Sequence, residues 1–293
     1  MTVVFPPRQP YRVPLPNGRV LELGARPLVM GILNVTPDSF AEVESRLDAA
    51  QAIDAALQME AQGADLIDVG GESTRPGADP LDAADETARV LPVLRGLAGR
   101  LRVPISIDTY KAEVADAALD AGVSLVNDIS GLQYDPPLAR VVADYGAALV
   151  LMHTRGRPQT MDADASYGDV VADVGAELKE RIVVAEAAGV ALDRIIVDPG
   201  IGFAKRPEHS YGVLARLPEL VAALGRPVLV GPSRKSFMRR ALDGRPAAER
   251  DWGTAATVSA AVLAGAHIVR VHAVAEMVQV VRVAEEIRRH SVE

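Results

Sequence analysis

The chain has 293 residues, of which 31 are basic and 39 acidic, so its formal net charge is −8 at neutral pH. Hydrophobic residues make up 49% of the chain, which is enough for a packed core and excludes wholesale disorder. The acidic balance argues against a nucleic-acid partner, because a nucleic-acid backbone is itself negative, but it allows one small anionic substrate in a local basic pocket. The chain has no cysteine, which excludes disulfides and thiolate metal sites and fits a reducing cytoplasm.

No segment of the sequence is typical of a membrane protein. The first residues, MTVVFPPRQPYRVP, lack the charged head and long apolar run of a secretory signal. The most apolar stretch, Ala255–Ala266, is rich in alanine and too short to span a bilayer. We therefore expect a cytoplasmic protein without a membrane partner.

Short runs of β-branched and apolar residues recur along the chain and indicate strands. In residues 1–27, two short runs flank Asn17-Gly18, which predicts a β-hairpin that plugs one end of the fold. Eight further runs are nearly continuous in apolar residues, which is typical of parallel strands buried on both faces. They are Leu28–Asn34, Leu66–Gly70, Ile105–Asp108, Leu125–Asp128, Ala148–His153, Ile195–Asp198, Val228–Gly231 and Ile268–His272.

Stretches with helical spacing separate these runs. The clearest are Asp48–Gln62, Asp82–Leu97, Ala112–Ala121, Asp169–Ala188 and Ala273–Arg289. Eight strand–helix units in one chain favour a (β/α)8 TIM barrel with an N-terminal β-hairpin, as one domain over residues 1–293. A doubly wound sheet with fewer strands is the alternative.

Polar side chains gather where the predicted strands end, which in a barrel is the catalytic mouth. One aspartate after a strand is usually a helix cap or a turn former, but eight polar strand ends together indicate a shared site. The residues at these ends are Asn34, Asp38, Asp68, Asp108, Asn127, Met152, His153, Asp198, Ser233, Lys235, Arg270 and His272.

Two pairs of these residues suggest particular chemistry. Arg270 and His272 are two apart on one strand, so they share a face and suit an anionic group, although His272 taken alone could cap a helix or fill core. A buried Arg270 needs an anion. Asp198 and Asn127 can together hold the edge of an aminopyrimidinone ring, since a carboxylate accepts two hydrogen bonds and an amide both donates and accepts.

Several common motifs are absent from the sequence. Gly200-Ile201-Gly202 lacks the third glycine of a dinucleotide fingerprint, and Ser233-Arg234-Lys235-Ser236 is not a P-loop. There is no HExxH or GxSxG motif, and the scattered histidines argue against a zinc cluster.

Eight blocks, in order and from about residue 28 to the end, resemble the dihydropteroate synthase family. They are MGILNVTPDSF (Met30–Phe40), GGESTRPGA (Gly70–Ala78), SIDTYKAEVA (Ser106–Ala115), NDISG (Asn127–Gly131), LMHTRGRPQTM (Leu151–Met161), DPGIGFAK (Asp198–Lys205), GPSRKSF (Gly231–Phe237) and GTAATVSAAVLAGAHIVRVH (Gly253–His272). The resemblance implies a (β/α)8 barrel, a homodimer, and the Mg²⁺-assisted joining of para-aminobenzoate to 6-hydroxymethyl-7,8-dihydropterin diphosphate with release of pyrophosphate.

The resemblance also implies roles for individual residues. Asn34 would bind the Mg²⁺, and Arg270 and His272 the diphosphate oxygens. Asp108, Asn127, Asp198 and Lys235 would line the pterin pocket, Met152 and Phe203 would form apolar walls, and Gly231 would allow close approach. Thr74 and Arg75 would lie in the loop after the second strand, and Ser233 near the para-aminobenzoate carboxylate at the start of a helix. Asp38 and Asp108 would stabilise the cation left on the pterin methylene when pyrophosphate departs, before the amine attacks.

The sequence departs from the family pattern after Phe40, where Ala41-Glu42-Val43-Glu44 replaces Ser-Asp-Gly-Gly. Losing two glycines restricts the backbone of that loop, which would be either harmless drift or a cause of slower closure. Two other functions stay open. A barrel that transfers methyl groups from methyltetrahydrofolate to a corrinoid would share the pterin-edge residues but lack the Ser233-Arg234-Lys235 block and Arg270 with His272. A non-catalytic pterin-binding module would not need the diphosphate residues that are retained here.

Overall fold

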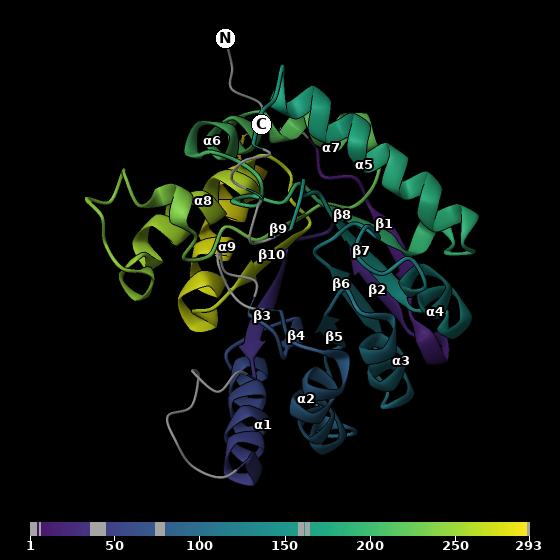
Figure 1. Ribbon diagram of the computed structural model, residues 1–293. Helices are drawn as coiled ribbons and strands as arrows, with labels where there is room; N and C mark the ends of the chain where they lie inside the picture. Colours follow the sequence, from purple (N-terminus) through teal and green to yellow (C-terminus); the bar gives the residue numbers. More distant parts are fainter. Residues whose placement is uncertain are drawn as a thin grey trace.

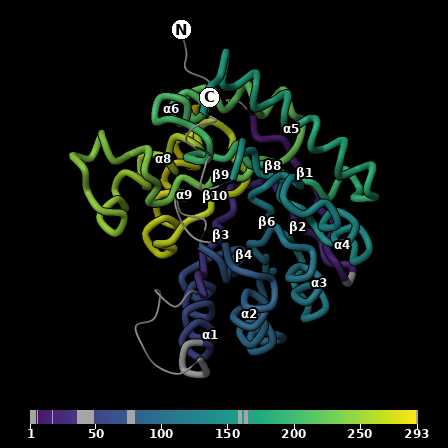
Figure 2. Tube along the Cα trace, in the orientation of Figure 1, coloured from purple at the N-terminus to yellow at the C-terminus, as the bar shows by residue number. Residues whose placement is uncertain are grey.

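The computed structural model describes residue 5 and residues 7–35, 45–73, 80–157, 161 and 165–291. The altered segment Ala41–Glu44 lies outside the described residues. Figure 1 shows helices arranged around a central set of strands, and Figure 2 lets the reader follow their alternation along the chain.

The central strands form one parallel sheet that closes into a barrel. Its strands are β3 (Leu28–Asn34), β4 (Leu66–Gly70), β5 (Ile105–Asp108), β6 (Leu125–Asp128), β7 (Ala148–Met152), β8 (Ile195–Asp198), β9 (Leu229–Val230) and β10 (Ile268–Val271). They pair in the order β8-β7-β6-β5-β4-β3-β10-β9, and a parallel bridge between Val197 and Val228 joins the two ends of that order. The predicted (β/α)8 barrel is therefore confirmed, and the doubly wound sheet is excluded.

Helices cover the outside of the barrel. They are α1 (Ser45–Ala61), α2 (Ala83–Leu97), α3 (Ala112–Asp120), α4 (Leu138–Tyr145), α5 (Val170–Ala187), α6 (Pro207–Ala215), α7 (Leu217–Leu224), α8 (Asp251–Leu263) and α9 (Val274–Arg289). Asp82 and Asp169 cap α2 and α5, since their carboxylates accept hydrogen bonds from backbone N–H groups of the first turn. Among the described helices, none combines the length and apolar character that crossing a membrane requires.

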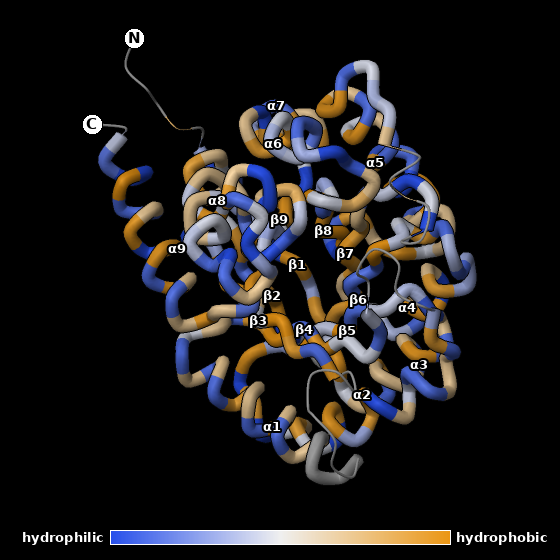
Figure 3. The backbone as a smooth tube through the Cα atoms, turned by 60° about the vertical axis from the view of Figure 1, so that its left-hand side comes forward, coloured by the Kyte–Doolittle hydropathy of each residue, from blue (hydrophilic) through white to orange (hydrophobic). Residues whose placement is uncertain are grey.

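Alternation along each strand divides the side chains between two cores. Outward residues such as Ile67, Val69 and Val126 pack against the helices in one large cluster. Inward residues such as Leu66 and Leu125 form a smaller cluster inside the barrel. In Figure 3 the strands at the centre are mostly orange, while the surrounding helices alternate between blue and orange. A polar side chain that follows one of these inward residues by two positions on the same strand therefore also points into the barrel.

The N-terminal hairpin closes one end of the barrel interior. β1 (Tyr11–Pro14) pairs antiparallel with β2 (Val20–Leu23), and a short 3₁₀ turn at Pro16–Gly18 joins them. Val13, Leu15 and Leu21 belong to the same inner cluster as residues from seven of the barrel strands. The predicted plug at the end opposite the polar strand ends is thus confirmed.

Candidate active site

Three side chains from distant parts of the sequence meet around Gly231, just after β9. A Cβ atom placed on Gly231 would lie 3.7 Å from Arg270 Cβ, 3.9 Å from Asp198 Oδ2 and 3.9 Å from Lys235 Nζ. The absence of a side chain at Gly231 therefore leaves space between a carboxylate, an ammonium and a guanidinium. We call the space around Gly231 the polar cup and define it by Asp108, Asn127, Asp198, Gly231, Lys235 and Arg270.

Asp198 ends β8 and is 4% exposed. Its Oδ1 accepts a hydrogen bond of 2.7 Å from the Gly200 N–H, which leaves Oδ2 facing Gly231. Gly200 has a φ of +67°, and a Cβ there would lie 1.9 Å from the His153 carbonyl oxygen, so only glycine fits this turn. Burial raises the pKa of Asp198, and the nearby Lys235 ammonium opposes that rise.

Lys235 brings a proton donor to the other side of Gly231. Its ammonium donates a hydrogen bond of 2.5 Å to the Ile201 carbonyl and lies 4.4 Å from the centre of the Phe203 ring. Burial lowers the pKa of Lys235 to about 8, although the Asp198 charge acts in the opposite direction. Phe203, half-buried beside this ammonium, supplies an apolar edge to the polar cup.

Arg270 on β10 is held between two carboxylates. Its Nε donates to Asp68 Oδ2 at 2.6 Å and its Nη2 to Asp108 Oδ2 at 2.5 Å. Burial would lower the pKa of Arg270, but the two carboxylates outweigh it and the pKa is raised, so the guanidinium stays charged. Burial, opposed by Arg270 and reinforced by Asp68, raises the pKa of Asp108 to about 7.

Asp68 is a residue to which the sequence analysis gave no role beyond its place at a strand end. It is fully buried, and its Oδ2 accepts from Asn127 Nδ2 at 2.9 Å as well as from Arg270. Its position along the strand could have indicated this role, because Asp68 lies two residues after inward-facing Leu66 on β4 and so points into the barrel as well.

Ser233 and His272 contact each other, but one expectation about Ser233 is wrong. The Ser233 hydroxyl lies 2.9 Å from His272 Nδ1 and accepts a hydrogen bond of 3.2 Å from the His272 N–H. No α-helix starts at Ser233, because a three-residue 3₁₀ turn at Ser236–Met238 follows and α8 begins only at Asp251. A helix N-terminus therefore does not explain anion binding at Ser233; the hydroxyl and the imidazole remain as the polar groups there.

Of the remaining predicted site residues, two lie at strand ends and three lie outside the described residues. Met152 ends β7, is 3% exposed, and its Cγ lies 3.3 Å from the Cβ position of Gly200. Asn34 ends β3 opposite Gly70 and is half-buried. Among the described residues, no group of three or more His, Asp or Glu side chains could hold a metal ion. The predicted site residues Asp38, Thr74 and Arg75 lie outside the described residues.

A buried network that the sequence analysis did not foresee supports the loop after β8. Lys205 Nζ lies 2.8 Å from His153 Nδ1 and 3.2 Å from the Phe203 carbonyl, and His153 Nε2 lies 3.0 Å from Glu177 Oε2. When Lys205 donates to Nδ1, the proton of the neutral ring is on Nε2, and this N–H donates a hydrogen bond to the Glu177 carboxylate. Burial, with Lys205 nearby, lowers the pKa of His153 to about 4, and burial lowers that of Lys205 to about 7.

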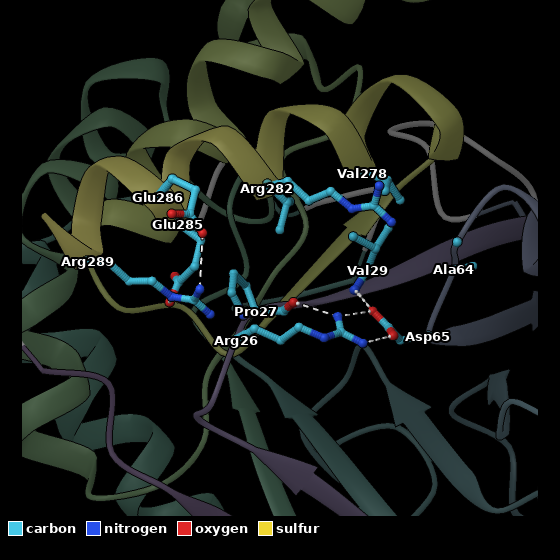
Figure 4. A pocket seen from close by; sticks show the side chains of 12 residues that line it. Arg26, Pro27, Val29, Ala64, Asp65, Val278, Arg282, Glu285, Glu286 and Arg289 are labelled. Carbon is cyan, nitrogen blue, oxygen red and sulfur yellow. Dashed lines mark hydrogen bonds and ion pairs between the residues drawn. The ribbon is translucent and has the colours of Figure 1, made fainter.

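A hollow of about 530 Å³ lies at the opposite end of the barrel, between α9 and the starts of β3 and β4 (Figure 4). Asp65 there accepts hydrogen bonds from Arg26 Nη1 at 2.8 Å and from the Val29 N–H at 2.9 Å. Across the hollow Arg289 pairs with Glu286 at 3.0 Å. Since these charged groups satisfy one another, the chemistry resides in the polar cup and not in this hollow.

Comparison with known proteins gives consistent results. The sequence pattern of the family described as pterin binding enzyme matches residues 30–272. The chain is 46% identical to the dihydropteroate synthase of Synechocystis over 97% of this chain and 96% of that protein. It is 43% identical to the dihydropteroate synthase of Escherichia coli over 92% of this chain and 94% of that protein.

Two solved structures are similar to the chain over nearly its whole length. The Burkholderia cenocepacia dihydropteroate synthase complexed with 7,8-dihydropteroate superposes with a TM-score of 0.85 at 42% identity, covering 96% of this chain and 98% of that one. The Yersinia pestis dihydropteroate synthase with a sulfonamide drug gives a TM-score of 0.87 at 41% identity, covering 94% of this chain and 98% of that one.

Proposed function

The chain belongs to the family of pterin-binding enzymes, among the dihydropteroate synthases, and from this premise we propose how its polar cup works. The reaction condenses 6-hydroxymethyl-7,8-dihydropterin diphosphate with para-aminobenzoate and gives 7,8-dihydropteroate and pyrophosphate. The observation that carries the proposal is the meeting of Asp198, Lys235 and Arg270 around Gly231. A flat heterocycle then fits beside the first two residues and its anionic tail beside the third.

The pterin ring binds at the Asp198 side of the polar cup. The Oδ2 oxygen of this buried carboxylate accepts from the guanidine-like edge of the ring, because Oδ1 is already used by the Gly200 N–H. Lys235 donates to the ring carbonyl, and Met152 and Phe203 flank the heterocycle as apolar walls. Asn127 and Asp108 complete the edge of the pocket. Leaving such buried polar groups unpaired costs roughly 10⁴-fold in discrimination, which makes the pocket selective for a pterin.

The diphosphate binds at Arg270 and His272, which lie two residues apart at the end of β10 and just beyond it. Ser233, in contact with His272, lies near the para-aminobenzoate carboxylate. Asn34 at the end of β3 would hold the Mg²⁺ through its carboxamide oxygen, a hard donor that suits this ion. Few protein ligands are needed, since Mg²⁺ usually keeps substrate phosphates and waters as its other ligands. When bound, Mg²⁺ neutralises charge on the departing pyrophosphate. Thr74 and Arg75 belong to the loop after β4, close in sequence to this end of the barrel.

The bond changes follow a dissociative order. The carbon–oxygen bond of the pterin methylene breaks with its electron pair going to pyrophosphate, and Arg270 stabilises the charge that develops. Asp108 and Asp38 stabilise the cation that remains on the methylene. The para-aminobenzoate nitrogen then forms the new carbon–nitrogen bond with its own lone pair and releases a proton to water. A secondary kinetic isotope effect near unity at the methylene carbon would contradict this order.

We extend the proposal to the assembly and location of the enzyme, which we place in the cytoplasm as a homodimer. Support for a second copy comes from exposed apolar side chains: Val283 and Ile287, one turn apart on α9, are 62% and 54% exposed. Light scattering should give twice the chain mass, and Val283→Glu with Ile287→Glu should give the mass of one chain. A single-chain mass for the unaltered protein would contradict the dimer.

The reaction itself is tested by pyrophosphate release. Protein, pterin diphosphate, para-aminobenzoate and Mg²⁺ together should release pyrophosphate, and omission of the protein, the pterin diphosphate or Mg²⁺ should stop it. Asp198→Ala should abolish binding of the pterin, and retention of binding within a few-fold would contradict the assigned role of Asp198. Absence of release from the unaltered protein would favour a non-catalytic pterin-binding module.

A further inference from the structure

We infer that Asp68 is a positioning residue that fixes the hydrogen-bonding direction of Asn127 and the place of Arg270 through a single oxygen atom. The inference rests on the proposed function and adds a determinant of substrate specificity to it. Asp68 lies behind the polar cup, fully buried in the barrel interior, so it acts on the substrate through the two residues that it holds.

The direction of the Asn127 amide follows from the charge of its partner. Asp68 Oδ2 accepts from Arg270 Nε at 2.6 Å and from Asn127 at 2.9 Å. A carboxylate oxygen has no hydrogen to donate, and this one already accepts a hydrogen bond from the guanidinium. Asn127 must therefore turn its NH₂ group toward Asp68. The reverse orientation would bring two acceptor oxygens together inside the barrel, which is unfavourable for buried groups.

Because its NH₂ group is used, Asn127 presents its carbonyl oxygen elsewhere. No described residue donates a hydrogen bond to that oxygen. Asp198 Oδ2 is likewise an acceptor that faces Gly231. The polar cup therefore offers acceptors at both residues, and it selects a heterocycle that carries N–H donors at the matching positions. A ring with a lone pair in place of the N–H that meets Asn127 should bind about 10²-fold more weakly, because two acceptors would then face each other.

Arg270 is held by the same atom. Its Nε is bound to Asp68 and its Nη2 to Asp108, so the guanidinium plane is fixed from behind before any phosphate arrives. A phosphate can compete with Asp108 for Nη2 while Nε remains on Asp68. One oxygen thus aligns the group for the heterocycle and the group for the anionic tail, and its loss should weaken both.

The test measures the two halves of the substrate separately. Calorimetry of Asp68→Ala with 6-hydroxymethylpterin and with inorganic pyrophosphate should show each affinity reduced by about ten-fold or more, although Asp68 is buried behind both. The matched control is Asp65→Ala near the start of the same strand, which removes a carboxylate that also holds an arginine and an N–H group. It should leave both affinities within about two-fold, because its partners are Arg26 and the Val29 N–H and not residues of the polar cup.

An exchange of donor and acceptor gives a sharper test. Asn127→Asp alone places a second carboxylate against Asp68 and should weaken pterin binding by about 10²-fold. Adding Asp68→Asn restores an N–H···O bond in the reverse direction and leaves an acceptor toward the ligand. Because Oδ2 serves both residues, the NH₂ group that replaces it no longer accepts from Arg270 Nε. The double variant should recover about ten-fold or more of the lost pterin affinity, whereas its affinity for pyrophosphate should stay reduced as in Asp68→Ala.

The outcomes separate this inference from the proposed function. A double variant that binds no better than Asn127→Asp, or an Asp68→Ala protein with one or both affinities unchanged, overturns it even if the unaltered enzyme releases pyrophosphate. If the unaltered enzyme releases none, the proposed function fails whatever Asp68 does. Should Asp68→Ala not fold, exchange of the Asn127 side-chain amide protons in the unaltered protein decides. Protection without ligand supports the inference, and protection only with pterin overturns it.

Discussion

Two aspartates three positions apart on one strand, Asp65 just before β4 and Asp68 within it, each hold an arginine and an N–H donor, yet they differ in what surrounds them. Asp65 binds Arg26 and the Val29 N–H beside the hollow of Figure 4, where the Arg26 side chain is 55% exposed. Asp68 binds Arg270 and Asn127 without any exposure. Similar contacts therefore have different energetic weight, because removing one partner from a buried pair is much more costly than removing one from an exposed pair.

The two regions also differ in how completely their polar groups are paired. Around Asp68, the Asp68 Oδ1, Asp108 Oδ1 and Ser106 Oγ atoms are buried without a hydrogen-bond partner among the described residues. Around Asp65, both carboxylate oxygens receive hydrogen bonds from Arg26. Unpaired buried polar atoms are unfavourable for stability and are typical of functional sites. Within the described part of the chain, Asp68 and Asp108 in the mouth of the barrel thus keep an unused acceptor atom each, whereas Asp65 does not.

The largest effect should come from Arg270→Ala, which removes the cation on which the mouth depends. Two carboxylates, Asp68 and Asp108, would remain buried without it, and the developing pyrophosphate charge would lose its partner. We expect kcat/KM to fall by about 10³-fold or more, measured by pyrophosphate release. A fall of less than ten-fold, in a variant that still folds, would remove Arg270 from the reaction.

At the opposite end, Arg8→Ala should be costly for stability but not for catalysis. Arg8 is 0% exposed in its side chain and pairs with Glu285 at 2.9 Å while its Nε donates to the Ala266 carbonyl. Removal leaves Glu285 buried, with more distant arginines as partners, and we expect a loss of about 3 kcal/mol in the free energy of unfolding. Urea denaturation measures it.

The control for Arg8→Ala is Arg12→Ala. Arg12 pairs with Glu22 on the hairpin, where both side chains are well exposed, so its loss should change the free energy of unfolding by about 0.5 kcal/mol or less. Equal losses of stability from the two variants would contradict the difference in burial between the two pairs. A fall in kcat for Arg8→Ala, measured where the variant is fully folded, would contradict a role in stability alone.

The stability contributed by Asp108, in the mouth of the barrel, should depend on pH. The pKa of Asp108 rises from 3.8 to about 7 on folding, so between these values the native state binds the proton and the unfolded state does not. Stability contributed by Asp108 is therefore lost as the pH rises from about 4 to about 7. Asp108→Asn removes this loss and keeps Asp68 as the partner of Arg270.

We expect Asp108→Asn to be more stable than the unaltered protein at pH 8, by on the order of 1–3 kcal/mol, and no more stable at pH 4. Its catalytic rate should fall below that of the unaltered protein as the pH rises above about 7, because only there is the Asp108 carboxylate of the unaltered protein ionised beside the reacting carbon. Thermal unfolding across pH 4–8 checks the sign. A stability difference that grows toward acid pH would show that Asp108 is ionised throughout.

The sequence predicted the barrel and most of the polar cup because both follow from local rules. Apolar runs such as Leu66–Gly70 reveal strands, and alternation shows which residues share their inner face. It could not predict that Asp68 holds Asn127 and Arg270, since these partners are 59 and 202 positions away and depend on the closure of the barrel. The prediction of a helix starting at Ser233 was wrong, because a three-residue 3₁₀ turn at Ser236–Met238 follows.

A small effect should also come from Arg26→Ala, which removes the arginine that Asp65 holds beside the start of β4. The Arg26–Asp65 pair has good bidentate geometry, but the guanidinium is largely in water, and Asp65 keeps the Val29 N–H after its removal. We therefore expect a loss of about 0.5–1 kcal/mol in the free energy of unfolding and no change in kcat or KM. Urea denaturation at low and high salt measures both the size and its screening. A loss as large as that of Arg8→Ala, or a change in KM, would mean that exposure does not separate the two ends of this barrel.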